Sequence, residues 1–324
     1  MAGQLWSVDT LGGYLASYKL SSNLRKQLQP MTKFRQFCDA KDQTKDGKKN
    51  GDTWTWDVVM NVATAGGTLV ETNTMPETNF KIYQATGTIT EYGNSVPYAG
   101  KLEALSQFDV RKPVETALRN DASKVLDSAA HAQFNETMLR YVGSSTTTGF
   151  LETGGTNTAV LNNTSILNLY HVGEIKDYMA ERNIPKYSGD EYVCIAHPST
   201  LRDLKTALQA VSQYVTAGYT KIMKGEIGMY EGIRFVEQSN IPKYAEFGAN
   251  NTNWAYFFGA DTVAEGIAIP EEVRGKIPGD YGRSKGVAWY YLGGFSNVHS
   301  QWTAAQDPGL LNTRIIKWDS LDAA

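Results

Sequence analysis

The sequence TWTWDVVM at residues 53–60 and the sequence FKIYQATGTITEY at residues 80–92 decide how this chain is organised. The first alternates between large apolar and small polar side chains, and this period of two is typical of a β-strand with one face to cover. The second is rich in Thr and is also strand-like. We predict a long β-hairpin with a turn-rich tip between these strands. Its apolar face consists of Trp54, Trp56, Val58 and Met60.

A two-stranded ribbon of this length is only marginally stable alone in water. Its apolar face therefore needs a cover, and we predict that a neighbouring copy of the chain supplies it. On this hypothesis Trp54, Trp56, Val58 and Met60 form an assembly interface. Replacing Trp54 and Trp56 with Ala should then abolish closure of the assembly while leaving the isolated fold largely intact.

The stretch 113–142 predicts one long amphipathic helix. Apolar residues recur there at steps of three and four, from Val114 and Leu118 to Val142. Pro113 suits the first turn of a helix, and Gly143 stands where a C-terminal cap is expected. A helix of 30 residues would be about 45 Å long.

The rest of the chain alternates loosely between helical and strand patterns, which favours the α+β class over a doubly wound parallel sheet. Residues 1–38 are interpreted as an extended arm with a short helix at 22–28. Further helices are predicted at 165–183 and from 199 through 211. Strands are predicted at 192–196, 233–236, 255–258, 287–292 and 313–318.

Composition limits the classes of function. The 324 residues are 41% hydrophobic and 20% charged, as in globular proteins, and the net charge of −3 does not indicate tight phosphate binding. Cys38 and Cys194 are far apart and predict two free thiols in a reducing compartment. Neither a signal peptide nor a run of eighteen apolar residues is present, so we expect a cytoplasmic protein without membrane contact.

Motifs for catalysis are lacking. The four histidines show no metal-ligand spacing, and the sequence has neither a phosphate-binding glycine loop nor a nucleophile elbow. His171 with Glu174, His197-Pro198 and the pair Glu271-Glu272 are each interpreted as structural or solvent-facing. We therefore predict no catalytic residue, no cofactor and no metal.

Four segments, taken in order, resemble the major capsid proteins of tailed bacteriophages, whose fold is named for phage Hong Kong 97. They run from about residue 39 to the end, and no single one is diagnostic. The segments are Glu91-Tyr-Gly-Asn94 continuing through Val96-Pro-Tyr98, Tyr192-Val-Cys-Ile-Ala-His-Pro198 with Leu201-Arg-Asp-Leu204, Gly225 to Glu237, and Leu311-Asn-Thr-Arg-Ile-Ile-Lys317.

The resemblance implies the Hong Kong 97 capsid fold, with an arm at 1–40, an extended loop at 41–100 and a peripheral domain with a spine helix at 101–165. It further implies an axial domain at 166–283 and C-terminal strands at 284–324 that return to the peripheral domain. The implied function is a major capsid protein that assembles as hexamers and pentamers into an icosahedral shell around double-stranded DNA, which it contacts nonspecifically. The implied location is the virion, after assembly in the host cytoplasm.

Some members of the family carry a scaffolding segment of roughly a hundred residues before the loop, whereas about forty residues precede it here. We therefore expect a separate scaffolding protein, together with a portal and possible decoration proteins as partners. Two alternatives stay open. One is an encapsulin-type nanocompartment shell on the same fold, and the other is an aromatic-rich carbohydrate-active enzyme or binding module.

Overall fold

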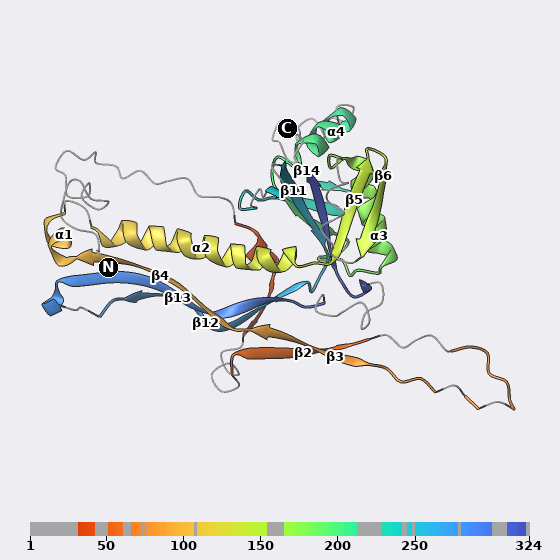
Figure 1. Cartoon of the computed structure of the whole chain (residues 1–324), viewed down its shortest axis with the longest axis horizontal. Coiled ribbons are helices and arrows are strands. Elements are labelled where there is room, and N and C mark those ends of the chain that lie inside the picture. The colour runs from red at the N-terminus through yellow and green to blue at the C-terminus, as the bar shows by residue number, and fades with distance from the viewer. Residues whose placement is uncertain are drawn as a thin grey trace.

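The computed structural model describes residues 32–42, 51–60, 66–72, 74–75, 77–106, 109–153, 165–212, 228–241, 245–247, 250–277, 280–299 and 310–321. The predicted helix at 22–28 lies outside these residues. The structure has an elongated body, a compact body at one end of it, and a β-ribbon with a long loop that projects beyond both (Figure 1). The mixture of helices and strands confirms the α+β prediction.

The elongated body is a twisted four-stranded sheet packed along one long helix (Figure 1). The sheet order is β1-β12-β13-β4; β1 pairs parallel with β12, whereas β12 with β13 and β13 with β4 are antiparallel pairs. Short helices lie at its ends. The elements are η2 (Phe34–Phe37), β1 (Asp39–Asp42), β4 (Thr90–Ala99), α1 (Gly100–Leu105), α2 (Arg111–Asn135), β12 (Val263–Gly275), η4 (Asp280–Gly282) and β13 (Ser284–Asn297).

The long helix α2 buries one residue in every four against the sheet, a spacing that keeps one stripe of the helix facing the core. It ends at Asn135, about 38 Å from its start, so the predicted continuation to residue 142 is wrong. The reason is that Leu139–Ser145 forms a strand, whose first five residues are all buried. A short, continuous buried strand cannot be told from a helix segment by periodicity.

The compact body is an eight-stranded mixed sheet with helices on one face. The strand order is β6-β5-β14-β11-β7-β9-β8, and β10 pairs with β11. Its elements are β5 (Leu139–Ser145), β6 (Thr148–Thr153), α3 (Leu169–Glu181), β7 (Tyr192–Ala196), α4 (Arg202–Ser212), β8 (Met229–Tyr230), β9 (Ile233–Glu237), β10 (Ala245–Phe247), β11 (Asn250–Phe258) and β14 (Ile315–Leu321).

The central strands of this sheet are buried on both faces. In β7, Val193 and Ile195 join the core that includes the α2 helix, whereas Cys194 and Ala196 join the core under α3. This explains the continuous apolar run at 192–196 that predicted a buried strand. Both Cys38 and Cys194 are free thiols, as predicted.

Several strands do not pair within the loop or domain range in which the sequence analysis placed them. β4 lies within the range 41–100 and β12 within 166–283, yet both pair with β13 in the elongated sheet. β14 lies within 284–324 but pairs with β11 and β5 in the compact body. Strand pairing between distant segments causes these differences, and local patterns carry no information about it.

Candidate assembly surface

The ribbon consists of β2 (Thr53–Val59) and β3 (Ile82–Thr88), which pair antiparallel from Thr53 opposite Thr88 to Val59 opposite Ile82. The alternation predicted for β2 is present, with Trp54 buried, Trp56 and Val58 half-buried, and the residues between them exposed. The return strand is shorter than the predicted 80–92, because the chain from Thr90 onward pairs with β13 instead.

Trp54 packs in a slot lined by glycines of its own chain. A Cβ atom added at Gly87 of β3 would lie 2.2 Å from the Trp54 ring, and one at Gly266 of β12 would lie 3.0 Å from it. At Gly294 of β13 the distance would be 3.1 Å. The absence of a side chain at these three glycines leaves room for the indole, which is 6% exposed.

The other residues of this face also contact the chain itself. The Trp56 indole donates a hydrogen bond to the carbonyl oxygen of Val298 at 3.2 Å. Met60 is half-buried, and its sulfur lies 3.0 Å from the Asn312 side-chain nitrogen. The expectation that a neighbouring copy must cover Trp54 is therefore wrong. A contribution of Trp54, Trp56, Val58 and Met60 to contacts between copies stays a prediction.

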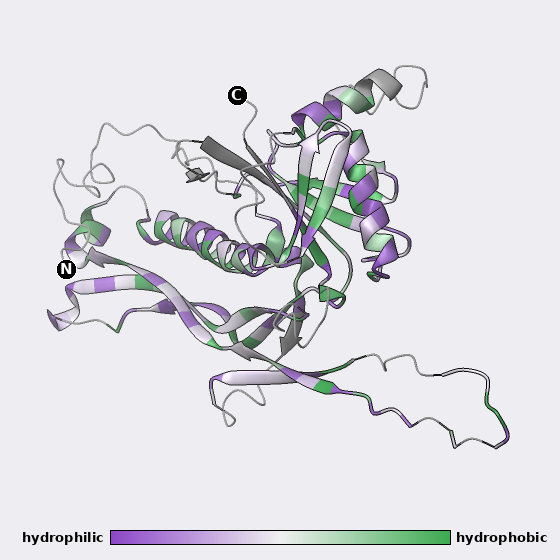
Figure 2. Cartoon of the chain, turned by 45° about the vertical axis from the view of Figure 1, so that its right-hand side comes forward, coloured by the Kyte–Doolittle hydropathy of each residue, from purple (hydrophilic) through white to green (hydrophobic). Residues whose placement is uncertain are grey.

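Exposed apolar side chains lie instead on the opposite face of the ribbon and along the loop that joins its strands. Each exposes more than half of its surface, and Figure 2 shows hydrophobic residues on the part of the loop that stands apart from both bodies. Sequence reasoning missed this set, because turn-like residues separate its members and hide any period. The residues are Val59, Leu69, Val70, Met75, Phe80 and Ile82.

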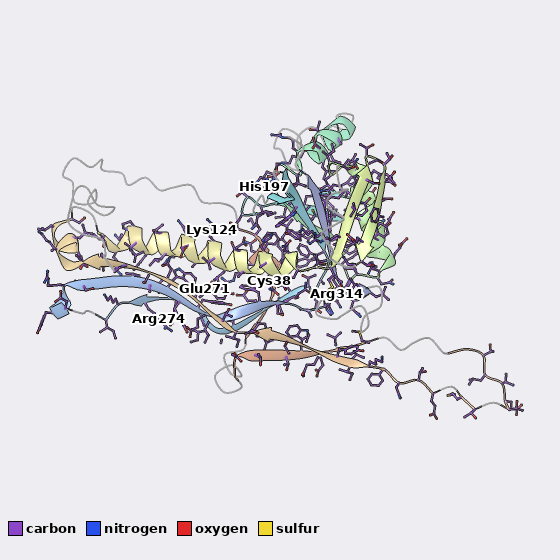
Figure 3. The ribbon with its side chains drawn as sticks, in the orientation of Figure 1. Cys38, Lys124, His197, Glu271, Arg274 and Arg314 are labelled. Carbon is purple, nitrogen blue, oxygen red and sulfur yellow. The ribbon has the colours of Figure 1, made fainter. Side chains whose placement is uncertain are left out.

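The first described residues tie the chain to the elongated body. The Arg35 guanidinium pairs with Glu265 at 2.8 Å and also with Glu271, and Figure 3 places Glu271 on the elongated sheet below α2. Glu272 pairs with Arg274 at 2.5 Å. The adjacent acids Glu271 and Glu272 therefore form separate ion pairs, and the expectation that they only face water is wrong.

The histidines have structural partners. His131 lies beside Tyr256, with His131 Nε2 2.9 Å from the hydroxyl, and burial lowers the pKa of His131 to about 4. His171 Nδ1 is 3.1 Å from the Tyr141 hydroxyl, which also contacts Glu174. His197 Nδ1 lies 2.6 Å from Ser199 Oγ at the start of the α4 turn. His131 and His171 thus join residues of different elements, and His197 makes a contact within one turn.

Within the described residues, no three His, Cys, Asp or Glu side chains are placed to hold a metal ion. In the same part of the chain, no helix is both long enough and apolar enough to cross a bilayer. The surface that stands out is therefore the projecting loop with its exposed apolar residues, which has the character of a contact surface for another protein.

Comparison with known proteins agrees with this geometry. A family model described as "Phage capsid protein" matches residues 38–269, which is more than half of the chain. No curated protein sequence matches.

Solved structures similar to nearly the whole chain include phage capsids. The capsid of Ralstonia phage GP4 is 17% identical, with a TM-score of 0.66 and 98% of each chain covered. The capsid of Helicobacter pylori bacteriophage KHP30 is 12% identical, with a TM-score of 0.70, and the match covers 94% of this chain and 95% of that one. At these identities the likeness shows a common fold.

Proposed function

The chain belongs to the phage capsid protein family, and we propose that it builds the shell of the virion by binding copies of itself through its projecting loop. It is the major capsid protein of a tailed bacteriophage, a structural subunit and not an enzyme. Membership of this family supports neither of the two alternatives, an encapsulin-type compartment shell or a carbohydrate-active enzyme or binding module.

The proposed mode of assembly rests on one observation: large apolar side chains are exposed along the projecting loop and on the outer face of the ribbon. Val59, Leu69, Val70, Met75, Phe80 and Ile82 are exposed on a segment that projects away from both bodies (Figure 1). Burying them against a neighbour would remove apolar surface from water, which favours association. Each contact can be weak, because closure of a shell multiplies many modest affinities.

On this proposal the elongated body is the peripheral domain, α2 is its spine helix and the compact body is the axial domain. Copies would gather as hexamers and pentamers of an icosahedral shell. The net charge of −3 suits a wall that encloses double-stranded DNA without binding it tightly, so contact with DNA would be nonspecific. Assembly would take place in the host cytoplasm, with a scaffolding protein, a portal and decoration proteins as partners.

The direct test is particle formation by the purified chain, followed by sedimentation velocity and electron microscopy. We expect rings or closed shells from the wild-type chain. We also expect that the same chain carrying Leu69→Ser, Val70→Ser and Met75→Ser stays small while its circular dichroism is unchanged. A wild-type chain that stays monomeric at high concentration would contradict the proposal. Shells of uniform, correct size from the chain alone would contradict the need for a scaffolding protein.

A further inference from the structure

His131 is a buried titratable side chain at the joint between the two bodies of the chain. It lies on α2, the long helix of the elongated body, one turn before the helix ends at Asn135. The ring is 6% exposed, and its centroid is 5.4 Å from that of Tyr256 on β11, a central strand of the compact body. Figure 1 shows this end of α2 meeting the compact body. A change of charge on His131 would therefore act where the two bodies meet.

The hydrogen bonds around the Tyr256 hydroxyl decide where the neutral His131 ring carries its hydrogen. The hydroxyl donates to Asn135 Oδ1 at 3.1 Å, so its one hydrogen is already used. His131 Nε2, 2.9 Å from the same hydroxyl oxygen, must then be the donor of their hydrogen bond. An additional proton would have to bind Nδ1 inside the core and make the ring a cation.

Two aromatic rings flank His131 in addition to Tyr256. Phe34 of η2 is fully buried, and its centroid lies 4.9 Å from that of the His131 ring. The Trp254 ring on β11 stacks at 5.9 Å with an angle of 24° between the planes. A neutral imidazole fits these apolar surroundings, whereas a charged one loses its hydration there. His131 on α2 therefore contacts both η2 and the compact body through a packing that requires the neutral ring.

Charged residues approach this packing from the sheet of the compact body. Lys317 on β14 is fully buried and stands opposite Tyr256 in the strand register. Arg140 on β5 and Glu152 on β6 continue the same cross-strand row. Residues opposite each other in a register share one face of the sheet. The row that leads to Tyr256 and His131 thus has two cations and one carboxylate.

Lys317 is the charged residue that acts on His131. Its Nζ lies 3.9 Å from the centre of the Trp254 ring, on which His131 also stacks. Burial and the positive charge of Lys317 together lower the pKa of His131 to about 4. A proton on His131 would therefore place a second cation beside Lys317 in the closed joint.

Asp127 is the buried carboxylate one turn before His131 on α2. It holds the same joint by accepting hydrogen bonds from neutral groups of η2 and of the compact body. The donors are Arg35 N, Gln238 Nε2 and Asn240 Nδ2. Among the side chains that the structure describes, none of the ion pairs joins a carboxylate to His131, so the charged ring gains no compensation.

We propose that His131 is an acid-operated lock: its protonation opens the joint between α2 and the compact body and frees η2, while each body keeps its fold. In the closed joint the charged ring would lie beside Lys317 without hydration, whereas in the open joint water reaches it. The lock lies within one chain, so it goes beyond self-assembly, and its test does not depend on whether shells form.

The direction of the pH dependence follows from the two states of the joint. In the open joint the ring is hydrated and has an ordinary pKa of 6.5, whereas in the closed joint its pKa is about 4. Between these values the open joint binds the additional proton. The opening constant should therefore rise as pH falls below 6.5, by at most about tenfold per pH unit, and level off below about pH 4.

Hydrogen–deuterium exchange of the full-length chain measures this opening, with rates corrected for intrinsic exchange at each pH. Peptides that cover residues 127–135 and 254–258 report on the joint, and peptides from β2 and β3 report on the ribbon. Between pH 7.5 and pH 4.5 we expect about a fifty- to hundredfold loss of protection at the joint. The ribbon should lose much less, and an equal loss in both regions would overturn the proposal.

The variant His131→Gln tests whether this ring is the trigger. Its amide can still donate to the Tyr256 hydroxyl but takes up no proton in this range, so protection of the joint should become nearly independent of pH. The matched control, His197→Gln, changes a histidine at the start of the α4 turn and should show the wild-type loss. An acid-induced loss in His131→Gln as large as in the wild type would overturn the proposal.

The pH profile of the wild-type chain decides the matter even if His131→Gln does not fold. A histidine lock gives a loss of protection that begins near pH 6.5. Opening caused by carboxylates, whose ordinary pKa is about 4, would begin only near that pH. A joint that stays fully protected down to pH 4.5 would therefore overturn the proposal, whether or not the chain forms shells.

Discussion

The base and the tip of the projecting loop use apolar residues in opposite ways. At the base, Trp54 is enclosed by glycines from three strands of its own chain, whereas at the tip Leu69, Val70 and Met75 have no cover. The base therefore anchors the ribbon to the elongated body, and the tip is left free to contact another molecule. On the proposed function, one hairpin thus combines a folding function with an assembly function.

The sharpest test of this comparison is Trp54→Ala. Removing a large buried aromatic side chain should cost about 3–5 kcal/mol of unfolding free energy, because the glycine slot would be left as a cavity. Chemical denaturation of the unassembled chain measures the loss, and Thr55→Ala on the exposed face of the same strand serves as the control. Unchanged stability with lost assembly would restore the earlier expectation that this face serves only contacts between copies.

The stability of the body can be changed separately from the loop by pH. The pKa of His131 is lowered to about 4 in the folded chain, against an ordinary value of 6.5. Between these values the unfolded chain binds the additional proton, so stability falls as pH decreases from 7 toward 4. The expected loss is about 3 kcal/mol.

The replacement His131→Gln should remove most of this pH dependence, because Gln can still bond to the Tyr256 hydroxyl but does not titrate in this range. Urea denaturation at pH 7 and pH 4.5 measures the effect in both chains. An equally steep loss in the variant would show that other groups cause the acid sensitivity.

Replacing a glycine with alanine should destabilise the chain at the base of the ribbon but not at the tip of the loop. Gly87→Ala places a methyl group where the Trp54 ring already lies, and overpacking of this kind costs about 1–3 kcal/mol. Gly67→Ala at the tip meets no atom within 4 Å and should not destabilise the chain. Thermal unfolding of the two variants gives the comparison, and equal losses would contradict the slot described for Trp54.

The sequence predicts the ribbon, the existence of the long helix and the buried strand at 192–196, because each shows as a local pattern: a period of two, a helical period and a continuous apolar run. It does not predict what covers Trp54. The covering glycines at 266 and 294 lie more than 200 residues away and show no pattern of their own. The predicted end of α2 is wrong for a related reason, since Leu139 to Val142 are buried as a strand only through pairing with β14 and β6.

The candidate assembly surface likewise depends on contacts between distant segments. Exposure of Val59 and Ile82 depends on which face of the ribbon turns toward the body. The sequence predicted that a neighbouring copy covers the tryptophan face, whereas Trp54 is buried by its own chain. Contacts that depend on distant pairing require the structure.

The smallest effect on the isolated chain is expected for Val59→Thr with Ile82→Thr. These residues pair across the ribbon and are 63% and 54% exposed, so no packing inside the chain is lost. Threonine keeps the β-branched shape that suits a strand, and the unfolding free energy should change by less than about 0.5 kcal/mol per site. Particle formation should nevertheless weaken, because the apolar face offered to a neighbour becomes polar.

The matched control, Thr55→Ser with Thr86→Ser, changes another exposed cross-strand pair without removing large apolar surface, and it should assemble normally. If both double variants assemble equally well, the exposed face of the ribbon does not contribute to assembly, and the contact between copies is confined to the tip.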